Sequence, residues 1–221
     1  MDTTTMREEI ATALAHERET GKLAQLVRRG YQKADAALDD AALTAKTERA
    51  VRIVQDYVGA MPEVIERALA AAKKESVLDH VQPIFDTAMS YVTENVDFIP
   101  DELGLAGLLD DAYLVHGLMQ EISHRQRALT GRELLPEGVF DTSQQIRRMI
   151  GEPTATRLDV AVVAFARRQN VRETVEQIVE KIGGAGLSMD LPSAVAFPSA
   201  GETDDLPNLE LGQASPQCTV F

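Results

Sequence analysis

The sequence predicts an all-α fold, a multi-helix bundle followed by a disordered acidic C-terminal tail. The chain of 221 residues has no Trp and only 5% aromatic residues, whereas Ala, Leu, Glu and Arg, which favour helices, are abundant. Apolar residues recur at helical spacing along most of the chain. After residue 183 Gly, Ser, Pro and acidic residues dominate, and no Lys or Arg follows. We therefore divide the chain into a helical domain, residues 1–183, and a flexible tail, residues 184–221.

The first third of the chain carries clear helix boundaries. Apolar spacing predicts two helices, or one kinked helix, over residues 4–38 around Gly21. The dipeptide Asp39-Asp40 is suited to cap the next helix, which continues to Pro62. Pro62 favours the first turn of a further helix, and Lys73-Lys74 suit the negative end of that helix.

Two longer helices are predicted in the middle of the chain, over residues 77–96 and 105–129. Thr130-Gly131 is suited to end the second helix. Between the two helices lies a turn that contains Pro100.

Capping-box patterns mark two later helix starts. Asp141 is followed three residues on by Gln144, and Asn170 three residues on by Glu173. A helix over residues 153–168 is expected between them. The last helix ends at the two glycines of positions 183 and 184.

The turn between the two middle helices is rich in carboxylates. It begins with Asp97-Phe98-Ile99-Pro100-Asp101 and continues through Gly104 and Gly107 to Asp110-Asp111. This pattern resembles the core motif of the YkvA-like family, a small bacterial domain of unknown function with a run similar to D-L-I-P-D, followed by G-x-L-D-D entering a helix. The resemblance covers about residues 80–120, and Glu102-Leu103 stands where the family has an apolar pair. The resemblance implies membership of this family, but it implies no biochemical activity.

The same segment offers two interpretations of its polar residues. Asp97, Asp101, Asp110, Asp111 and His116 could hold a divalent metal or act as acid and base. Adjacent residues on a helix point about 100° apart, so at most one of Asp110 and Asp111 faces the turn. In the other interpretation Asp97 and Asp101 accept backbone N–H bonds in the turn, and His116 is a hydrogen-bonded core residue.

No other pattern indicates catalysis. The chain has no G-x-S-x-G elbow, no phosphate-binding Gly-rich loop and no zinc-type Cys pair. We therefore assign no catalytic residue. The one cofactor considered is the divalent metal that the carboxylates of residues 97–111 and His116 could hold.

Charge and hydropathy limit the classes of partner. A net charge of -13 and a pI near 4.7 argue against nucleic acid, which requires a basic face. The longest uncharged apolar run, residues 160–166, is too short for a membrane span. The N-terminus lacks the pattern of a secretory signal, and a single Cys allows no intrachain disulfide. We expect a cytoplasmic protein.

The tail contains scattered apolar residues, which predict docking on a partner or on the chain's own domain. Those assigned to partner binding are Leu206, Leu209, Leu211 and Phe221. Cys218 begins the sequence Cys-Thr-Val-Phe, which matches a prenylation box, so lipidation at Cys218 is one hypothesis and an incidental Cys is the other.

These observations predict a non-enzymatic regulatory or scaffolding protein that acts by protein–protein interaction through helix grooves or through its C-terminal tail. One alternative is a metal-dependent hydrolase that uses residues 97–116. Another is a peripheral membrane-associated protein held by a lipid on Cys218. Homo-oligomerisation through an apolar helix face is left open.

Overall fold

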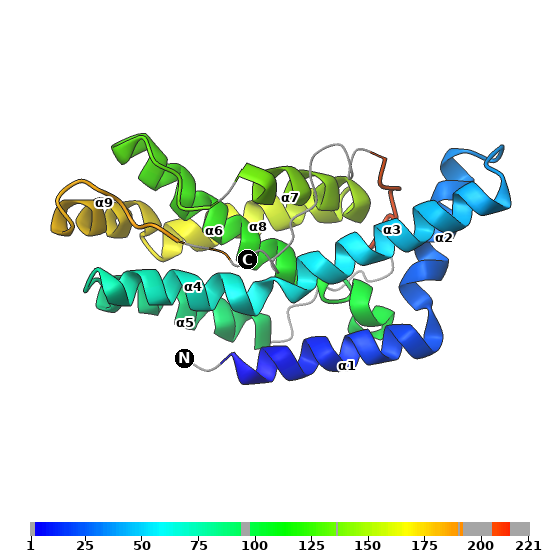
Figure 1. Ribbon diagram of the computed structural model, residues 1–221, viewed down its shortest axis with the longest axis horizontal. Coiled ribbons are helices and arrows are strands. Elements are labelled where there is room, and N and C mark those ends of the chain that lie inside the picture. Colours follow the sequence, from blue (N-terminus) through cyan, green and yellow to red (C-terminus); the bar gives the residue numbers. More distant parts are fainter. Residues whose placement is uncertain (1–2, 94–97, 136, 190, 192–204, 213–221) are drawn as a thin grey trace.

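The computed structural model of the chain is built from helices (Figure 1). The structure describes residues 3–93, 98–135, 137–189, 191 and 205–212, and these ranges contain no strand. Within them, the side chains of residues 87–93, 101 and 137–140 are not described. The predicted all-α bundle is confirmed.

The first four helices begin and end close to the predicted positions. They are α1 (Thr4–Thr20), α2 (Lys22–Ala34), α3 (Asp40–Gly59) and α4 (Met61–Lys74). Gly21 has φ 59° and separates α1 from α2, so this segment forms two helices. The carboxylate of Asp39 accepts a hydrogen bond of 2.7 Å from the amide of Ala42, as expected of an N-cap. Pro62 lies in the first turn of α4.

The middle of the chain contains α5 (Leu78–Thr93), the short 3-10 helix η1 (Asp101–Ala106) and α6 (Leu109–Thr130). α6 begins four residues later than predicted, because residues 105 and 106 belong to η1. Within η1, Gly104 has φ 64° and ψ -123°, which are not helical. Gly131 has φ 72° and ends α6 at the predicted stop.

The remaining helices are α7 (Glu137–Ile150), α8 (Thr154–Arg168) and α9 (Val171–Lys181). The predicted helix start at Asp141 is wrong, because α7 extends a full turn upstream of that residue. Asn170 does precede α9, with φ 50°, but its side chain makes no capping hydrogen bond.

Helix α6 is the centre of the bundle. It packs against α3, α4, α7, α8 and α9, and Figure 1 shows α4 and α5 running below α6, α8 and α9. Its buried side chains include apolar residues such as Leu109 and Met119 and also polar ones, Asp110, His116 and Gln126. Buried polar groups require hydrogen-bond partners, so we expect each of these three side chains to hold another segment of the chain in place.

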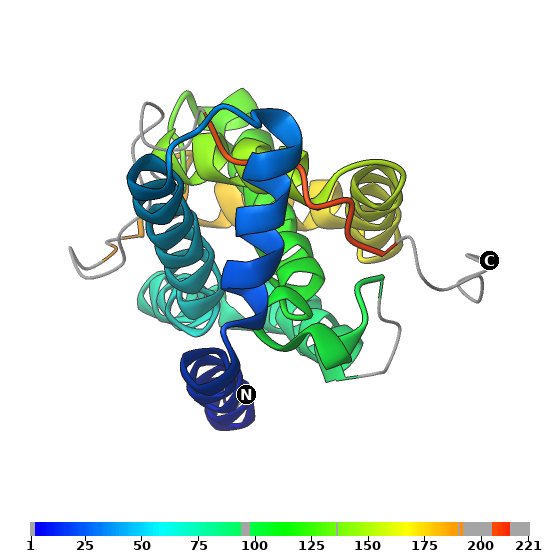
Figure 2. The ribbon, with the colours of Figure 1, turned by 90° about the vertical axis from the view of Figure 1, so that its right-hand side faces the viewer.

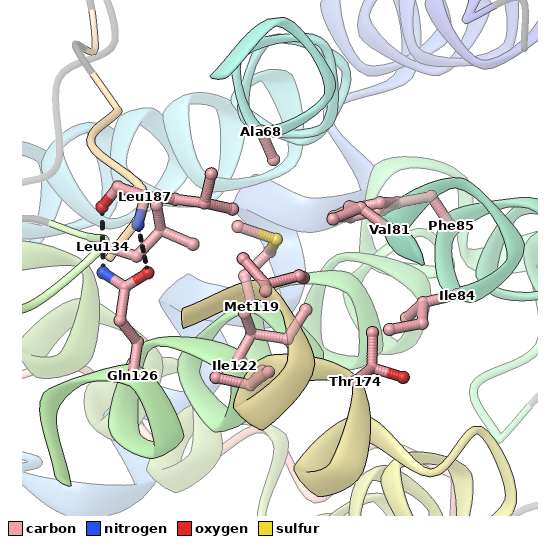
Figure 3. A pocket seen from close by; sticks show the side chains of 12 residues that line it. Ala68, Val81, Ile84, Phe85, Met119, Ile122, Gln126, Leu134, Thr174 and Leu187 are labelled. Carbon is pink, nitrogen blue, oxygen red and sulfur yellow. Dashed lines mark hydrogen bonds between the residues drawn. The ribbon is translucent and has the colours of Figure 1, made fainter. Parts of the chain in front are cut away.

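Gln126 fixes the chain after α9. Its amide group donates to the carbonyl of Leu187 at 2.9 Å and accepts from the amide of Leu187 at 2.6 Å. Figure 3 shows this pair beside an apolar cavity that Met119, Ile122 and other core side chains line. The cavity encloses about 20 Å³, which is room for about one water molecule. It is a packing defect of the core, too small in this form for an organic ligand.

Candidate peptide-binding surface

Residues 205–212 form a non-helical segment that packs across the helices, and we call it the strap. It passes α2 at Gly30 and the end of α7, and its last residue lies beside Thr154 at the start of α8. Figure 2 shows the strap in red, running past α2 toward α8. We call the helix residues beneath it the strap-binding surface, which comprises Gly30, Lys46, Arg49, Met149, Ile150 and Gly151.

An ion-pair cluster holds the first residue of the strap. The carboxylate of Asp205 accepts hydrogen bonds from Lys46 and from Arg49, one turn apart on α3. Burial by itself would raise the pKa of Asp205, but the hydrogen bond from Lys46 and the charge of Arg49 outweigh it and lower that pKa. The ammonium group of Lys46 also lies 5.5 Å from the ring centre of Tyr31. The cluster therefore favours an anion at this position.

Main-chain hydrogen bonds hold the middle of the strap. The amide of Leu209 donates to the carbonyl of Met149 at 2.7 Å, and the amide of Leu211 donates to that of Ile150 at 2.8 Å. Both carbonyls belong to the last turn of α7, where a helix leaves its C=O groups without internal partners. Leu211 is only 4% exposed. The strap thus supplies hydrogen-bond donors to the last carbonyl groups of α7 and buries the Leu211 side chain against the bundle.

Two glycines allow the strap to approach the helices closely. A Cβ on Gly30, in the middle of α2, would lie 3.0 Å from the Cβ of Pro207. A Cβ on Gly151 would lie 2.2 Å from Oδ1 of Asn208, and Gly151 has φ 81°. Oδ1 of Asn208 in turn accepts from the amide of Glu210 at 2.9 Å. A larger residue at either glycine would displace the strap.

Asp110 supports the far end of the strap through the carboxylate-rich turn. It is 3% exposed, and its Oδ2 accepts from the amides of Phe98 at 2.8 Å and Ile99 at 3.1 Å. Burial raises the pKa of Asp110 to about 7, although these hydrogen bonds act in the opposite direction. A Cβ on Gly212 would lie 2.6 Å from the carbonyl oxygen of Phe98, so the turn that Asp110 holds contacts the end of the strap.

His116 is a core residue. It is fully buried, its Nε2 lies 2.9 Å from the carbonyl oxygen of Tyr57, and its ring centre is 4.4 Å from that of Tyr57. Burial lowers the pKa of His116 to about 4, so the ring is neutral at physiological pH. Asp110 is occupied with the backbone of the turn, and within the described part of the chain no three His, Cys, Asp or Glu residues converge on a metal position.

The other residues predicted from the sequence are distributed as follows. Leu206 and Leu209 are half-buried and Leu211 is buried, all three within the strap on the chain's own helices. Asp111 lies in the first turn of α6, beside Asp110. Asp97, Cys218 and Phe221 lie outside the described residues, as does the side chain of Asp101.

Among the described residues, no helix combines the length and the apolar character that a membrane span requires. No protein-family model, no curated protein and no solved structure matches the chain. The YkvA-like resemblance of residues 97–111 therefore stays a prediction.

The strap-binding surface was missed from the sequence, although two signals pointed to it. Gly30 stands inside a helical pattern, where glycine lowers helix propensity and often marks a close approach of another segment. The tail after Lys181 has no basic residue, while Lys46 and Arg49 lie one turn apart on α3. Neither signal identifies the carbonyl groups of Met149 and Ile150, because main-chain acceptors carry no residue signature.

Proposed function

We propose that this chain is a non-enzymatic regulatory or scaffolding protein that acts by protein–protein interaction. Its strap-binding surface receives an extended, acidic, leucine-containing segment of a partner protein. The observation that carries the proposal is that the chain's own strap occupies this surface in the way that a bound peptide would.

Three features of the strap support this comparison. An acidic side chain lies between two cations, main-chain amides donate to fixed carbonyls, and leucine side chains pack on the helices. In extended-peptide recognition the main-chain bonds supply affinity and the side-chain contacts supply specificity. A partner segment with the same pattern would make the same contacts.

The strap then acts as an internal competitor. A covalently attached segment has an effective concentration on the order of mM, so a free peptide of equal intrinsic affinity must exceed that level to displace it. A partner gains access when its segment binds more tightly or when the strap is weakened. This arrangement suits a regulated interaction.

The metal-hydrolase alternative is less well supported by the geometry. Asp110 binds the backbone of the turn and His116 binds the carbonyl of Tyr57 in the core. Both side chains therefore have structural partners that they would have to leave in order to reach a substrate.

The test is the binding of a fluorescent peptide with the sequence of residues 205–212 to the full chain, measured by anisotropy. Leu211→Ala weakens the strap, because truncating a buried Leu costs roughly 2 kcal/mol or more. We expect the peptide to bind Leu211→Ala at least about 10-fold more tightly than the wild type. The control is Leu129→Ala, which removes the same side chain from a position that is 49% exposed.

A control peptide carries Asp in place of Leu209 and Leu211. Equal binding of the peptide to wild type and Leu211→Ala, or binding of the control peptide as tightly as the parent, contradicts the proposal. Circular dichroism verifies that both variants keep their helices.

A further inference from the structure

Two buried hydrogen-bond donors around the ion-pair cluster are not used. Among the residues that the structure describes, the hydroxyl of Tyr31 and the Nε of Arg49 are buried and have no hydrogen-bond partner. An unsatisfied buried polar group costs about 1–3 kcal/mol, so a group of this kind requires an explanation. Arg49 binds Asp205 directly through Nη2, and the charge of Asp205 acts on Tyr31.

The carboxylate of Asp205 accepts from neither Nε of Arg49 nor the hydroxyl of Tyr31. One of its oxygens accepts from Lys46 and the other from Nη2 of Arg49. Nε and Nη2 share one edge of the guanidinium plane, which is suited to bind two oxygens of one anion. Asp205 uses only half of that edge.

Tyr31 is near enough to sense the same anion. It is 4% exposed, and burial raises its pKa to about 12, with the negative charge of Asp205 as the next cause. Its hydroxyl therefore keeps its proton and is a donor at physiological pH. The charges are also unequal, because two cations, Lys46 and Arg49, face the single negative charge of Asp205.

We propose that Lys46, Arg49 and Tyr31 form a subsite for a phosphoserine or phosphothreonine in the partner segment, at the position that Asp205 holds in the strap. This inference rests on the proposed function. A phosphate group carries three acceptor oxygens and a charge of about -1.5 to -2 at neutral pH. It can accept from Lys46, from both Nε and Nη2 of Arg49 and from the hydroxyl of Tyr31, and it balances both cations. Phosphorylation of the partner would then allow its segment to replace the strap.

The experiment compares three peptides with the sequence of residues 205–212 that carry Asp, phosphoserine or Ser at the first position. Each is titrated by anisotropy against the full-length Leu211→Ala chain. We expect the phosphoserine peptide to bind about 10-fold more tightly than the Asp peptide, and the Ser peptide to bind most weakly. The advantage should shrink as the pH falls below about 6, where the phosphate takes up a proton.

Two further substitutions test the named donors. Tyr31→Phe removes a hydroxyl that has no hydrogen-bond partner among the described residues, so the fold should tolerate it. The ratio of the Kd of the Asp peptide to the Kd of the phosphoserine peptide should fall. Arg49→Lys keeps the charge but removes the paired edge, and it should lower the same ratio.

The outcomes separate the two proposals. If no peptide binds, the proposed function fails and the subsite fails with it. If the Asp peptide binds and the phosphoserine peptide binds no more tightly, the phosphate subsite is overturned while the binding function stands. An unchanged ratio in both Tyr31→Phe and Arg49→Lys also overturns the subsite.

Discussion

Replacing Asp110 with Asn should change the pH dependence of stability. In the folded chain the pKa of Asp110 is about 7, whereas an unfolded Asp has a pKa of about 4. A raised pKa of an acid means that its contribution to stability is complete below about pH 4 and is lost as the pH rises to about 7. Asn keeps a carbonyl oxygen for the amides of Phe98 and Ile99 but does not titrate.

The magnitude follows from the size of the shift. Three pKa units correspond to about 4 kcal/mol, which is the stability that Asp110 loses between about pH 4 and pH 7. His116 acts in the opposite direction, because its folded pKa of about 4 lies below its ordinary value of 6.5. Its contribution is complete above about pH 6.5, and about 3 kcal/mol is lost as the pH falls to about 4. In the wild type the two effects largely cancel.

The assay is urea unfolding followed by far-UV circular dichroism at several pH values between about 4 and 7. Asp110→Asn should match the wild type near pH 4 and exceed it by several kcal/mol near pH 7, since only the wild type carries the buried charge there. Asp110→Ala is the control, because it leaves both buried amides without an acceptor and should be less stable than Asp110→Asn throughout. A difference between Asn variant and wild type that stays constant from pH 4 to pH 7 refutes the reasoning.

Two other predictions concern contacts elsewhere in the fold. Gly59→Ala should raise the free energy of unfolding by up to about 1 kcal/mol, because a Cβ there meets nothing within 4 Å and Ala favours helices. Gly30→Ala should gain less or lose stability in the same urea assay, since its Cβ would press against Pro207 at 3.0 Å; equal gains at both positions would contradict the close packing of the strap. Gln126→Ala should cost about 2 kcal/mol or more, because it leaves the amide and carbonyl of Leu187 unpaired. An effect below about 0.5 kcal/mol in thermal or urea unfolding would show that water replaces the Gln126 side chain.

Much of the bundle could be predicted because its signals are local. Gly21, Asp39 and Pro62 each act within one turn of chain, and each ends, caps or begins a helix where expected. Asp141 shows the limit of such signals. The residues of a capping-box pattern can also lie inside a helix, and α7 begins one turn before Asp141 and includes it.

The candidate site could be predicted only in part. The apolar tail residues Leu206, Leu209 and Leu211 were predicted to dock on a partner or on the chain's own domain, and the structure places them on the latter. The surface on which they pack includes Met149 and Gly30, which are about 60 and 180 positions away in sequence. No local sequence pattern connects such distant residues. The role of Asp110 was missed for a similar reason: backbone capping of the turn was assigned to Asp97 and Asp101, and only the tertiary fold directs the carboxylate of Asp110 to residues 98 and 99.

The most direct test of the strap-binding surface is an NMR titration of the isotope-labelled wild-type chain with the unlabelled peptide of residues 205–212. The measurement follows the amide signals of Leu209 and Leu211 as the peptide rises to several times the mM effective concentration of the attached strap. We predict that both signals move to positions typical of an unbound peptide while the signals of α6 stay in place. Strap signals that remain unchanged at the highest peptide concentration, or that move only when the helices unfold, would contradict the account.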